Sequence, residues 1–383
     1  MKALSLGSPC RLQLVKPRHL AVSLLAALLS LGLHVQARAA VHGGIEIGAK
    51  GVKATVLDVS DGTDGYEVKI LLSGTQNTTL TAGLASAGRF QAGAVKETSA
   101  AVAKFAEQMR QKYKVPKTRI YVVGSSGLFS ALGAKKEAIQ ANQALLAAAV
   151  QEACGLRIRF INVQREIELS IAGIVPAKRA ADSLLLDIGG GNTKGGYRKA
   201  DNECVTVSIP YGSVTFADMV KKHADKESFA EAATALRAEV LVPALRKGID
   251  KKPELLERKR IYLSGGAVWA MVSFVRPSNC RSYVALTADD IAAYRQLLLK
   301  TPDSFPNIDL STIEDTKLRE QVHKEIERVK KVYQPRQLLA GAEILQALSS
   351  EFHFDHEKKL YFARNAPTGW ILAYVAEKEA GQR

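Results

Sequence analysis

The sequence predicts an α/β protein of two lobes that face each other across an anion-binding cleft. Two similar hairpins, one near the start of each half of the chain, carry this prediction. The hairpin at residues 184–197 (LLLDIGGGNTKGGY) has an apolar strand that ends in Asp187, then a glycine-rich turn and a returning strand. The hairpin at residues 43–59 (GGIEIGAKGVKATVLDV) repeats this pattern, with Glu46 as the acid. A chain of 383 residues is long enough to form two cores.

The glycine-rich turns indicate phosphate binding. Gly189, Gly190 and Gly191 supply no packing and cost backbone entropy, so the turn needs positive φ or close approach of another group. Consecutive N–H groups in such a turn form an anion-binding nest, and Asp187 can hold Mg²⁺ through its water shell. The alternative is a tight hairpin with a capping aspartate, because short glycine motifs often match by chance. The second copy around Glu46 favours the phosphate site.

The N-terminus has the three regions of a secretory signal peptide. Residues 1–39 contain basic residues, an apolar run at 20–35, and Ala37-Arg38-Ala39. We expect cleavage after Ala39 and export to the periplasm or beyond. The apolar run is shorter than the roughly 20 residues of a membrane span, and an uncleaved anchor is the alternative.

Charge and cysteine content narrow the partners. Without its five basic residues in 1–39, the chain has 48 Lys and Arg against 38 Asp and Glu, a net charge of +10, which favours anionic partners. Aromatic residues are few and are not interleaved with the basic ones, so no nucleic acid is expected.

Cys154, Cys204 and Cys280 allow at most one internal disulfide and lack metal-site spacing. We interpret them as mostly buried hydrophobes, with one oxidised pair left open.

The first lobe is predicted at residues 40–180. After the first hairpin come a strand at 66–72, a helix at 94–114 and a strand (RIYVVGSSG) that ends in Ser125 and Ser126. These serines offer hydroxyl and N–H groups to an anion; an ordinary helix N-cap is the alternative. A helix at 135–154 and a strand at 156–163 then lead into a helix that opens with Glu166 and Glu168, acids that the helix dipole alone would also favour.

The second lobe is predicted at residues 181–350. It has a strand at 205–209, a helix at 229–247, and a strand at 261–264 before Gly265 and Gly266. Helices follow from Thr287, with an exposed, charge-alternating one at 317–331. Residues 351–383 are expected to form a strand and a helix that pack back on the first lobe.

The paired hairpins resemble those of the fold shared by actin, hexokinase and the heat-shock chaperone ATPases, which clamps a nucleotide or phosphate between two lobes. The segment at 261–269, IYLSGGAVW, resembles the adenosine-side motif of that superfamily. The resemblance implies two actin-like lobes with a ribonuclease H-like sheet in each, and a nucleotide-side role for Gly265 and Gly266.

The order of motifs from residue 44 to about 275 resembles the exopolyphosphatase and guanosine pentaphosphate phosphohydrolase (Ppx/GppA) family. Glu46-Ile47-Gly48 is similar to its acid-x-Gly hairpin, with Glu for Asp. The turn at 124–129 resembles Ala-Thr-Ser-Ala-Leu-Arg, with Phe129 where a phosphate-binding Arg is usual. The segment at 163–168 resembles the catalytic Ser-Gly-x-Glu-Glu-Ala and keeps Glu166. The segment at 187–194 resembles Asp-Ile-Gly-Gly-Gly-Ser-Thr-Glu, with Asn192 for Ser and Lys194 for Glu.

The resemblance implies Mg²⁺-assisted hydrolysis of a terminal phosphoanhydride in inorganic polyphosphate or a nucleoside polyphosphate. It implies Glu166 as the base for the attacking water, and Glu46 and Asp187 as metal ligands. The implied phosphate-binding residues are Gly48, Ala49, Lys50, Ser125, Ser126, Gly189, Gly190, Gly191, Asn192, Thr193 and Lys194.

Two alternatives remain open at this point. The departures at Phe129 and Lys194 are compatible with an anion-binding protein without turnover, in which Lys194 either supplies positive charge or occupies the metal's place. An actin-like or sugar-kinase-like ATPase is disfavoured by export, because ATP is scarce outside the cytosol. Monomer and homodimer both remain open.

Overall fold

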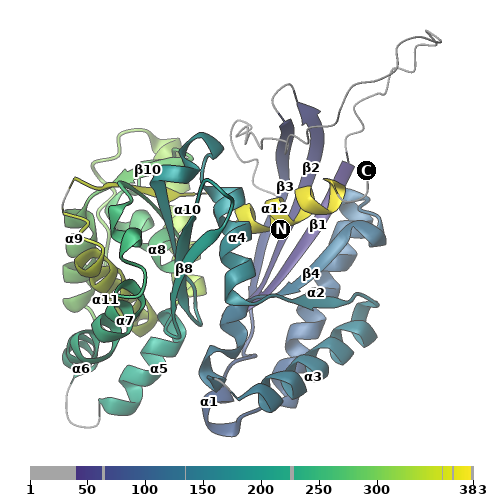
Figure 1. Ribbon diagram of the computed structural model, residues 1–383, viewed down its shortest axis with the longest axis horizontal. Helices are drawn as coiled ribbons and strands as arrows, with labels where there is room; N and C mark the ends of the chain where they lie inside the picture. The colour runs from purple at the N-terminus through teal and green to yellow at the C-terminus, as the bar shows by residue number, and fades with distance from the viewer. Residues whose placement is uncertain are drawn as a thin grey trace.

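The computed structural model describes residues 40–62, 65–133, 135–224, 228–355, 357–364 and 366–380. The expected signal peptide at 1–39 lies outside these residues. Figure 1 shows two lobes side by side, with the first half of the chain in purple to blue and the second in teal to green. None of the helices within the described residues has both the length and the apolar character that a membrane crossing requires.

The first lobe is built on a five-stranded sheet in the order β3-β2-β1-β4-β5. Its strands are β1 (Ala40–Gly48), β2 (Gly51–Gly62), β3 (Gly65–Asn77), β4 (Ile120–Gly124) and β5 (Ile158–Phe160). The first three are antiparallel, and β4 and β5 run parallel to β1. The helices are α1 (Leu84–Ala87), α2 (Ala92–Tyr113) and α3 (Lys136–Cys154), with 3-10 turns at Lys117–Arg119 and Ser126–Leu132. Apolar residues at helical spacing, such as Val102, Phe105 and Met109, bury one side of α2 against this sheet.

Two element boundaries in this lobe differ from the sequence expectation. Strand β3 continues to Asn77, because it pairs with β2 as far as the turn at Gly51. The strand expected at 156–163 is only three residues long, since α4 (Val163–Ile174) begins at the last residue of the expected strand. The Asn162 side chain caps this helix by accepting the N–H of Arg165 at 2.8 Å.

The second lobe repeats the strand order of the first. Its sheet runs β10-β11-β9-β6-β7-β8. The strands are β6 (Ser183–Ile188), β7 (Thr193–Arg198), β8 (Cys204–Ile209), β9 (Arg260–Ser264), β10 (Tyr283–Leu286) and β11 (Lys359–Ala363). Strands β6 to β8 are antiparallel, β9 is parallel to β6, and β11 is parallel to β9. The hairpins β1-β2 and β6-β7 therefore hold equivalent places, and the predicted two-lobed α/β architecture is confirmed.

Helices form most of the rest of the second lobe. They are α5 (Ser213–His223), α6 (Phe229–Leu236), α7 (Val242–Ile249), α8 (Gly266–Val275), α9 (Ala288–Leu299), α10 (Thr316–Val332) and α11 (Pro335–Glu351), with 3-10 turns at Ala177–Asp182 and Pro253–Glu257. The helix expected at 229–247 is continuous, with a π-helical turn at Arg237–Leu241 joining α6 to α7. Helix α10 exposes its charges as predicted, but buries Val322, Ile326 and Val329.

Two helices are exchanged between the lobes. Helix α4 follows β5 of the first sheet, yet its Ile167 and Ile171 pack with Leu185 of the second sheet. Helix α12 (Ala366–Ala380) follows β11 of the second sheet, yet it packs on the first sheet, and Figure 1 shows it in yellow across that lobe. The two helices cross at Gly173 and Gly369, where a Cβ on Gly173 would lie 1.8 Å from the Gly369 carbonyl oxygen. Only glycine permits this close crossing.

The cysteines differ from expectation. Cys154 and Cys204 are half-buried, Cys280 is exposed, and all three are free thiols. The expectation of mostly buried cysteines is therefore wrong, because Cys154 ends a helix, Cys204 begins a strand and Cys280 lies in a loop, where side chains stay partly open to solvent.

Candidate active site

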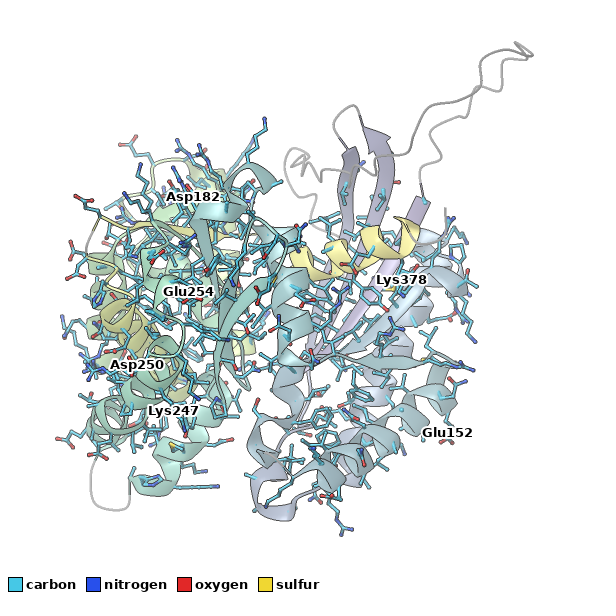
Figure 2. The ribbon with its side chains drawn as sticks, viewed as in Figure 1. Glu152, Asp182, Lys247, Asp250, Glu254 and Lys378 are labelled. Carbon is cyan, nitrogen blue, oxygen red and sulfur yellow. The ribbon has the colours of Figure 1, made fainter. Side chains whose placement is uncertain are left out.

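The turns singled out in the sequence meet between the lobes. The Gly191 backbone lies against Gly127, so that a Cβ on Gly191 would be 2.0 Å from the Gly127 carbonyl oxygen. Next to this contact, the Asn192 side-chain amide donates a hydrogen bond to the Ser126 hydroxyl at 2.9 Å. The turn after β4 and the turn between β6 and β7 are therefore in direct contact. Figure 2 shows the labelled acids Glu152 and Asp250 on opposite outer sides of the two lobes.

Glu166 lies beside this contact and is 7% exposed. One of its carboxylate oxygens accepts the N–H of Ser126 at 2.9 Å, and the other lies 3.1 Å from Lys194 Nζ. Glu168, two residues along α4, points elsewhere, as expected from helical spacing. It pairs with Arg165 at 3.2 Å and is 31% exposed. Ser125 occupies the N-cap position of the turn that follows β4, but its side chain accepts no capping hydrogen bond.

The acid of each hairpin is paired with a lysine. Glu46 lies opposite Lys53 in the β1-β2 register, and Asp187 lies opposite Lys194 in β6-β7. Lys194 Nζ is 2.8 Å from Asp187 Oδ2, and Lys53 Nζ is 3.3 Å from both oxygens of Glu46. The Lys194 side chain is 4% exposed, whereas that of Lys53 is 45% exposed and its ion pair is screened by water.

Further donors complete the environment of these acids. The indole N–H of Trp370, on α12, donates to Glu46 at 3.0 Å, and the Ser264 hydroxyl donates to Asp187 at 2.7 Å. Burial alone would raise the pKa of Asp187, but Lys194 and Ser264 together outweigh it and hold that pKa below its usual value. Burial would likewise lower the pKa of Lys194, but Asp187 and Glu166 outweigh it and raise that pKa. Asp187 and Lys194 are therefore both ionised at neutral pH.

Lys50 is the cation at the interlobe contact that has no carboxylate partner among the described residues. From the β1-β2 turn it reaches the second lobe, where Nζ donates to the Gln337 side chain and lies 3.9 Å from the ring centre of Tyr333. Its stem also packs on Gly190, where a Cβ would be 2.8 Å from Lys50 Cγ. Burial lowers the pKa of Lys50 to about 7. An anion in this position would supply the missing counter-charge.

The remaining predicted phosphate-binding residues fall into two groups. Gly48 and Ser125 lie beside Glu46, since a Cβ on Gly48 would be 3.3 Å from Glu46 Oε1 and 3.6 Å from the Ser125 hydroxyl. Ala49 and Thr193 instead form hydrogen bonds within their own lobes. The carbonyl of Ala49 accepts the Thr81 hydroxyl at 3.0 Å, and the Thr193 hydroxyl donates to the Tyr211 carbonyl at 2.8 Å.

The glycine turn is held by α5. The carbonyls of Gly189 and Gly190 accept the first N–H groups of that helix, from Ser213 at 3.0 Å and Val214 at 2.9 Å. This contact fixes the turn, because it satisfies N–H groups that a helix start leaves without intrahelical partners.

The predicted nucleotide-side glycines lie against protein. Gly265 has φ of 96° and packs on Ile188, and a Cβ on Gly266 would be 1.9 Å from the Tyr333 hydroxyl oxygen. Phe129, where the family resemblance expects a phosphate-binding Arg, packs with Phe90 and Phe160 at ring-centre distances of 5.9 and 5.8 Å. It therefore belongs to an aromatic cluster of the first lobe and adds no charge to the cleft.

The residues expected to hold Mg²⁺ do not fit that ion. Both oxygens of Asp187 already accept hydrogen bonds, one from Ser264 and one from Lys194. Both oxygens of Glu46 face the Lys53 ammonium, and one also accepts the Trp370 N–H. Within the described part of the chain, no three His, Cys, Asp or Glu residues are grouped as a metal site requires.

Two repeated sheets with paired hairpins at an interlobe contact define an actin-like, ATPase-type fold. The model of the Ppx/GppA phosphatase family matches residues 55–268, which is more than half of the chain, and the chain belongs to this family. Phosphatases of this family are generally dependent on a divalent metal.

Solved structures agree with the fold. A Ppx/GppA family member from Aquifex aeolicus has 18% identity and a TM-score of 0.59, covering 90% of this chain and 99% of its own. An exopolyphosphatase from Cytophaga hutchinsonii has 16% identity and a TM-score of 0.60, covering 88% and 98%. An exopolyphosphatase-like protein has 16% identity and a TM-score of 0.62, covering 88% and 99%. No curated protein sequence matches the chain.

Sequence reasoning missed several residues of the site. Lys53 could have been found, because a tight hairpin turn at 49–50 places residue 53 directly opposite residue 46. Trp370, Tyr333 and Gln337 carried no local signal. They reach the site from helices that are distant in the sequence.

Proposed function

We propose that this chain hydrolyses terminal phosphoanhydride bonds of inorganic polyphosphate or nucleoside polyphosphates between its lobes. The observation that carries the proposal is the position of Glu166, a buried carboxylate where the Ser126 turn and Lys194 meet. Phosphoryl transfer needs positioning and neutralisation of charge more than covalent chemistry from the protein. A fixed carboxylate next to N–H groups and ammonium groups meets both needs.

Each residue then has a defined task. Glu166 accepts a proton from the attacking water, while the Ser126 N–H keeps its carboxylate oriented. Lys194 and Lys50 offset the charge of the polyanion. Mg²⁺ was the ion expected to neutralise phosphate charge here. The lysine-paired acids do not fit it, so all these tasks are assigned to the chain's own residues.

A second candidate is binding of the same polyanions without turnover. Lys194 ties Glu166 to Asp187, with Nζ 3.1 and 2.8 Å from the two carboxylates. One oxygen of Glu166 is thus already engaged by an ammonium group, and Phe129 contributes no positive charge. These observations favour retention of the anion site with reduced hydrolysis.

We propose export of the chain on the basis of its N-terminal sequence. Export favours polyphosphate or extracellular nucleotides as ligands over a cytosolic signalling nucleotide. N-terminal sequencing after expression in a bacterial host tests this, and a protein with Met1 retained in the cytosol contradicts it. Light scattering of the same sample distinguishes the monomer from the homodimer.

Phosphate release measured with polyphosphate, ATP and guanosine pentaphosphate separates the candidates. Each substrate is tested with Mg²⁺ and with EDTA, and binding is measured in parallel by calorimetry. Release that Glu166→Gln abolishes supports the hydrolase. Binding without release leaves the anion-binding protein, and release from ATP alone restricts hydrolysis to nucleoside triphosphates, as in the ATPase alternative.

A further inference from the structure

We propose that the Lys194 ammonium takes the place of a divalent metal, so that this site binds phosphate oxyanions without a metal ion. The inference rests on the proposed function and specifies how its site neutralises charge. The family resemblance assigns Glu46 and Asp187 to a metal, but a lysine ammonium group pairs with each of these acids. The inference follows from this disagreement.

The first observation is the position of Lys194 between the two lobes. Its Nζ joins Asp187 of β6 at 2.8 Å to Glu166 of α4 at 3.1 Å. A divalent ion held by Asp187, one of the two implied metal ligands, would need this same space. Because Lys194 lies directly opposite Asp187 in the hairpin, the strand register itself fixes the ammonium there.

The second observation is that all three ammonium donors of Lys194 have partners. The third partner is Asn192 Oδ1 at 3.3 Å, the longest of the three contacts. An entering phosphate oxygen would replace this neutral partner at the least cost, because the two carboxylates hold their donors more strongly. The Asn192 amide also bonds Ser126 of the other lobe, so this exchange occurs at the interlobe contact.

The third observation is that the equivalent hairpin has the same arrangement. Lys53 Nζ lies 3.3 Å from both oxygens of Glu46, the other acid assigned to metal. Both expected metal ligands are thus paired with an ammonium group from the neighbouring strand. Together with Lys50, the cleft carries three ammonium groups against the carboxylates of Glu46, Glu166 and Asp187.

Titration with Mn²⁺ alone, followed by electron paramagnetic resonance, tests the inference without any substrate. The wild-type protein should show no Mn²⁺ site tighter than roughly millimolar. Lys194→Glu, which adds a carboxylate, should gain a site at least about tenfold tighter, and its melting temperature should rise with Mg²⁺. If Lys194→Glu does not fold, Lys194→Gln removes the ammonium without adding charge and should also gain affinity. Lys199→Gln is the matched control, because Lys199 pairs with Glu203 at the surface.

Binding of tripolyphosphate to the full-length protein, measured in EDTA and in Mg²⁺, completes the test. The same Kd within about twofold in both conditions is expected, with weakening by at least about tenfold in Lys194→Gln. A stoichiometric Mn²⁺ site in the wild type, or tripolyphosphate binding that requires Mg²⁺, overturns the inference and leaves the proposed function intact. Absence of tripolyphosphate binding in both conditions contradicts the proposed function, while the Mn²⁺ titration still decides the role of Lys194.

Discussion

Replacement of Glu166 by Gln is the sharpest test of the hydrolase. A general base contributes typically about 10²- to 10⁴-fold to rate, so Glu166→Gln should lower phosphate release by that factor. Gln keeps the shape and can still accept the Ser126 N–H, so the turn should stay in place. Anion binding should not weaken, because the change removes a negative charge next to a polyanion.

The structure also bounds the effect on stability. Glu166→Gln removes one of the two carboxylates of Lys194, but Asp187 remains at 2.8 Å from Nζ. The buried ammonium therefore keeps a counter-charge, and the loss should be about 1–3 kcal/mol of unfolding free energy, typical of one charged hydrogen bond. A folded domain is typically stable by about 5–15 kcal/mol, so most of the variant should remain folded and unfolding should not account for the loss of rate.

The assay compares Glu166→Gln with Glu168→Gln at equal concentrations of folded protein. Glu168 lies on the same helix, is 31% exposed and pairs with Arg165, so its replacement should change the rate less than about twofold. Phosphate release and tripolyphosphate binding are measured for both. An equal loss of rate in the two variants would indicate a general electrostatic effect, and no loss in Glu166→Gln would remove it from the mechanism.

Three other predictions concern the cleft. Burial lowers the pKa of Lys50 to about 7, so Lys50 loses its positive charge above pH 7 in the free protein. A bound polyanion keeps Lys50 protonated. The affinity for tripolyphosphate should then fall by up to about tenfold per pH unit between pH 7 and 9. The free energy of unfolding of the free protein should rise over the same range, since the unfolded chain binds the Lys50 proton more tightly than the folded chain does. A flat pH profile, or one that Lys50→Gln leaves unchanged, contradicts this. Gly191→Ala should abolish tripolyphosphate binding, because its Cβ would lie 2.0 Å from the Gly127 carbonyl oxygen of the other lobe. Gly93→Ala is the control: its Cβ would meet open space, so this variant should bind normally in the same calorimetric titration. Asp187→Asn should raise tripolyphosphate affinity several-fold by freeing one donor of Lys194, and weaker binding would show that the ion pair positions Lys194.

The sequence predicted those parts of the molecule that local patterns determine. An apolar strand followed by a glycine-rich turn gives each of the two hairpins, and helical spacing separates Glu166 from Glu168. The pairs of lysine and acid were also determined locally, because strand register places Lys194 opposite Asp187. A lysine near an acid is common in sequences, however, so it gave no reason to exclude Mg²⁺. The contact of Trp370 with Glu46 joins residues 324 positions apart and depends on where α12 packs. No pattern in either segment encodes such a contact.

The exchange of α4 and α12 has a consequence for the order of folding during synthesis. Strands β1 and β2 are the first elements of the described chain to be made, and α12, whose Ile371 and Val375 share a buried cluster with Leu57, is the last. That face of the first sheet therefore stays uncovered until the C-terminus has been synthesised. A chain truncated before residue 366 would leave Leu57 and its neighbours exposed, and would lack the Trp370 donor to Glu46. The last helix to be synthesised thus completes the first lobe.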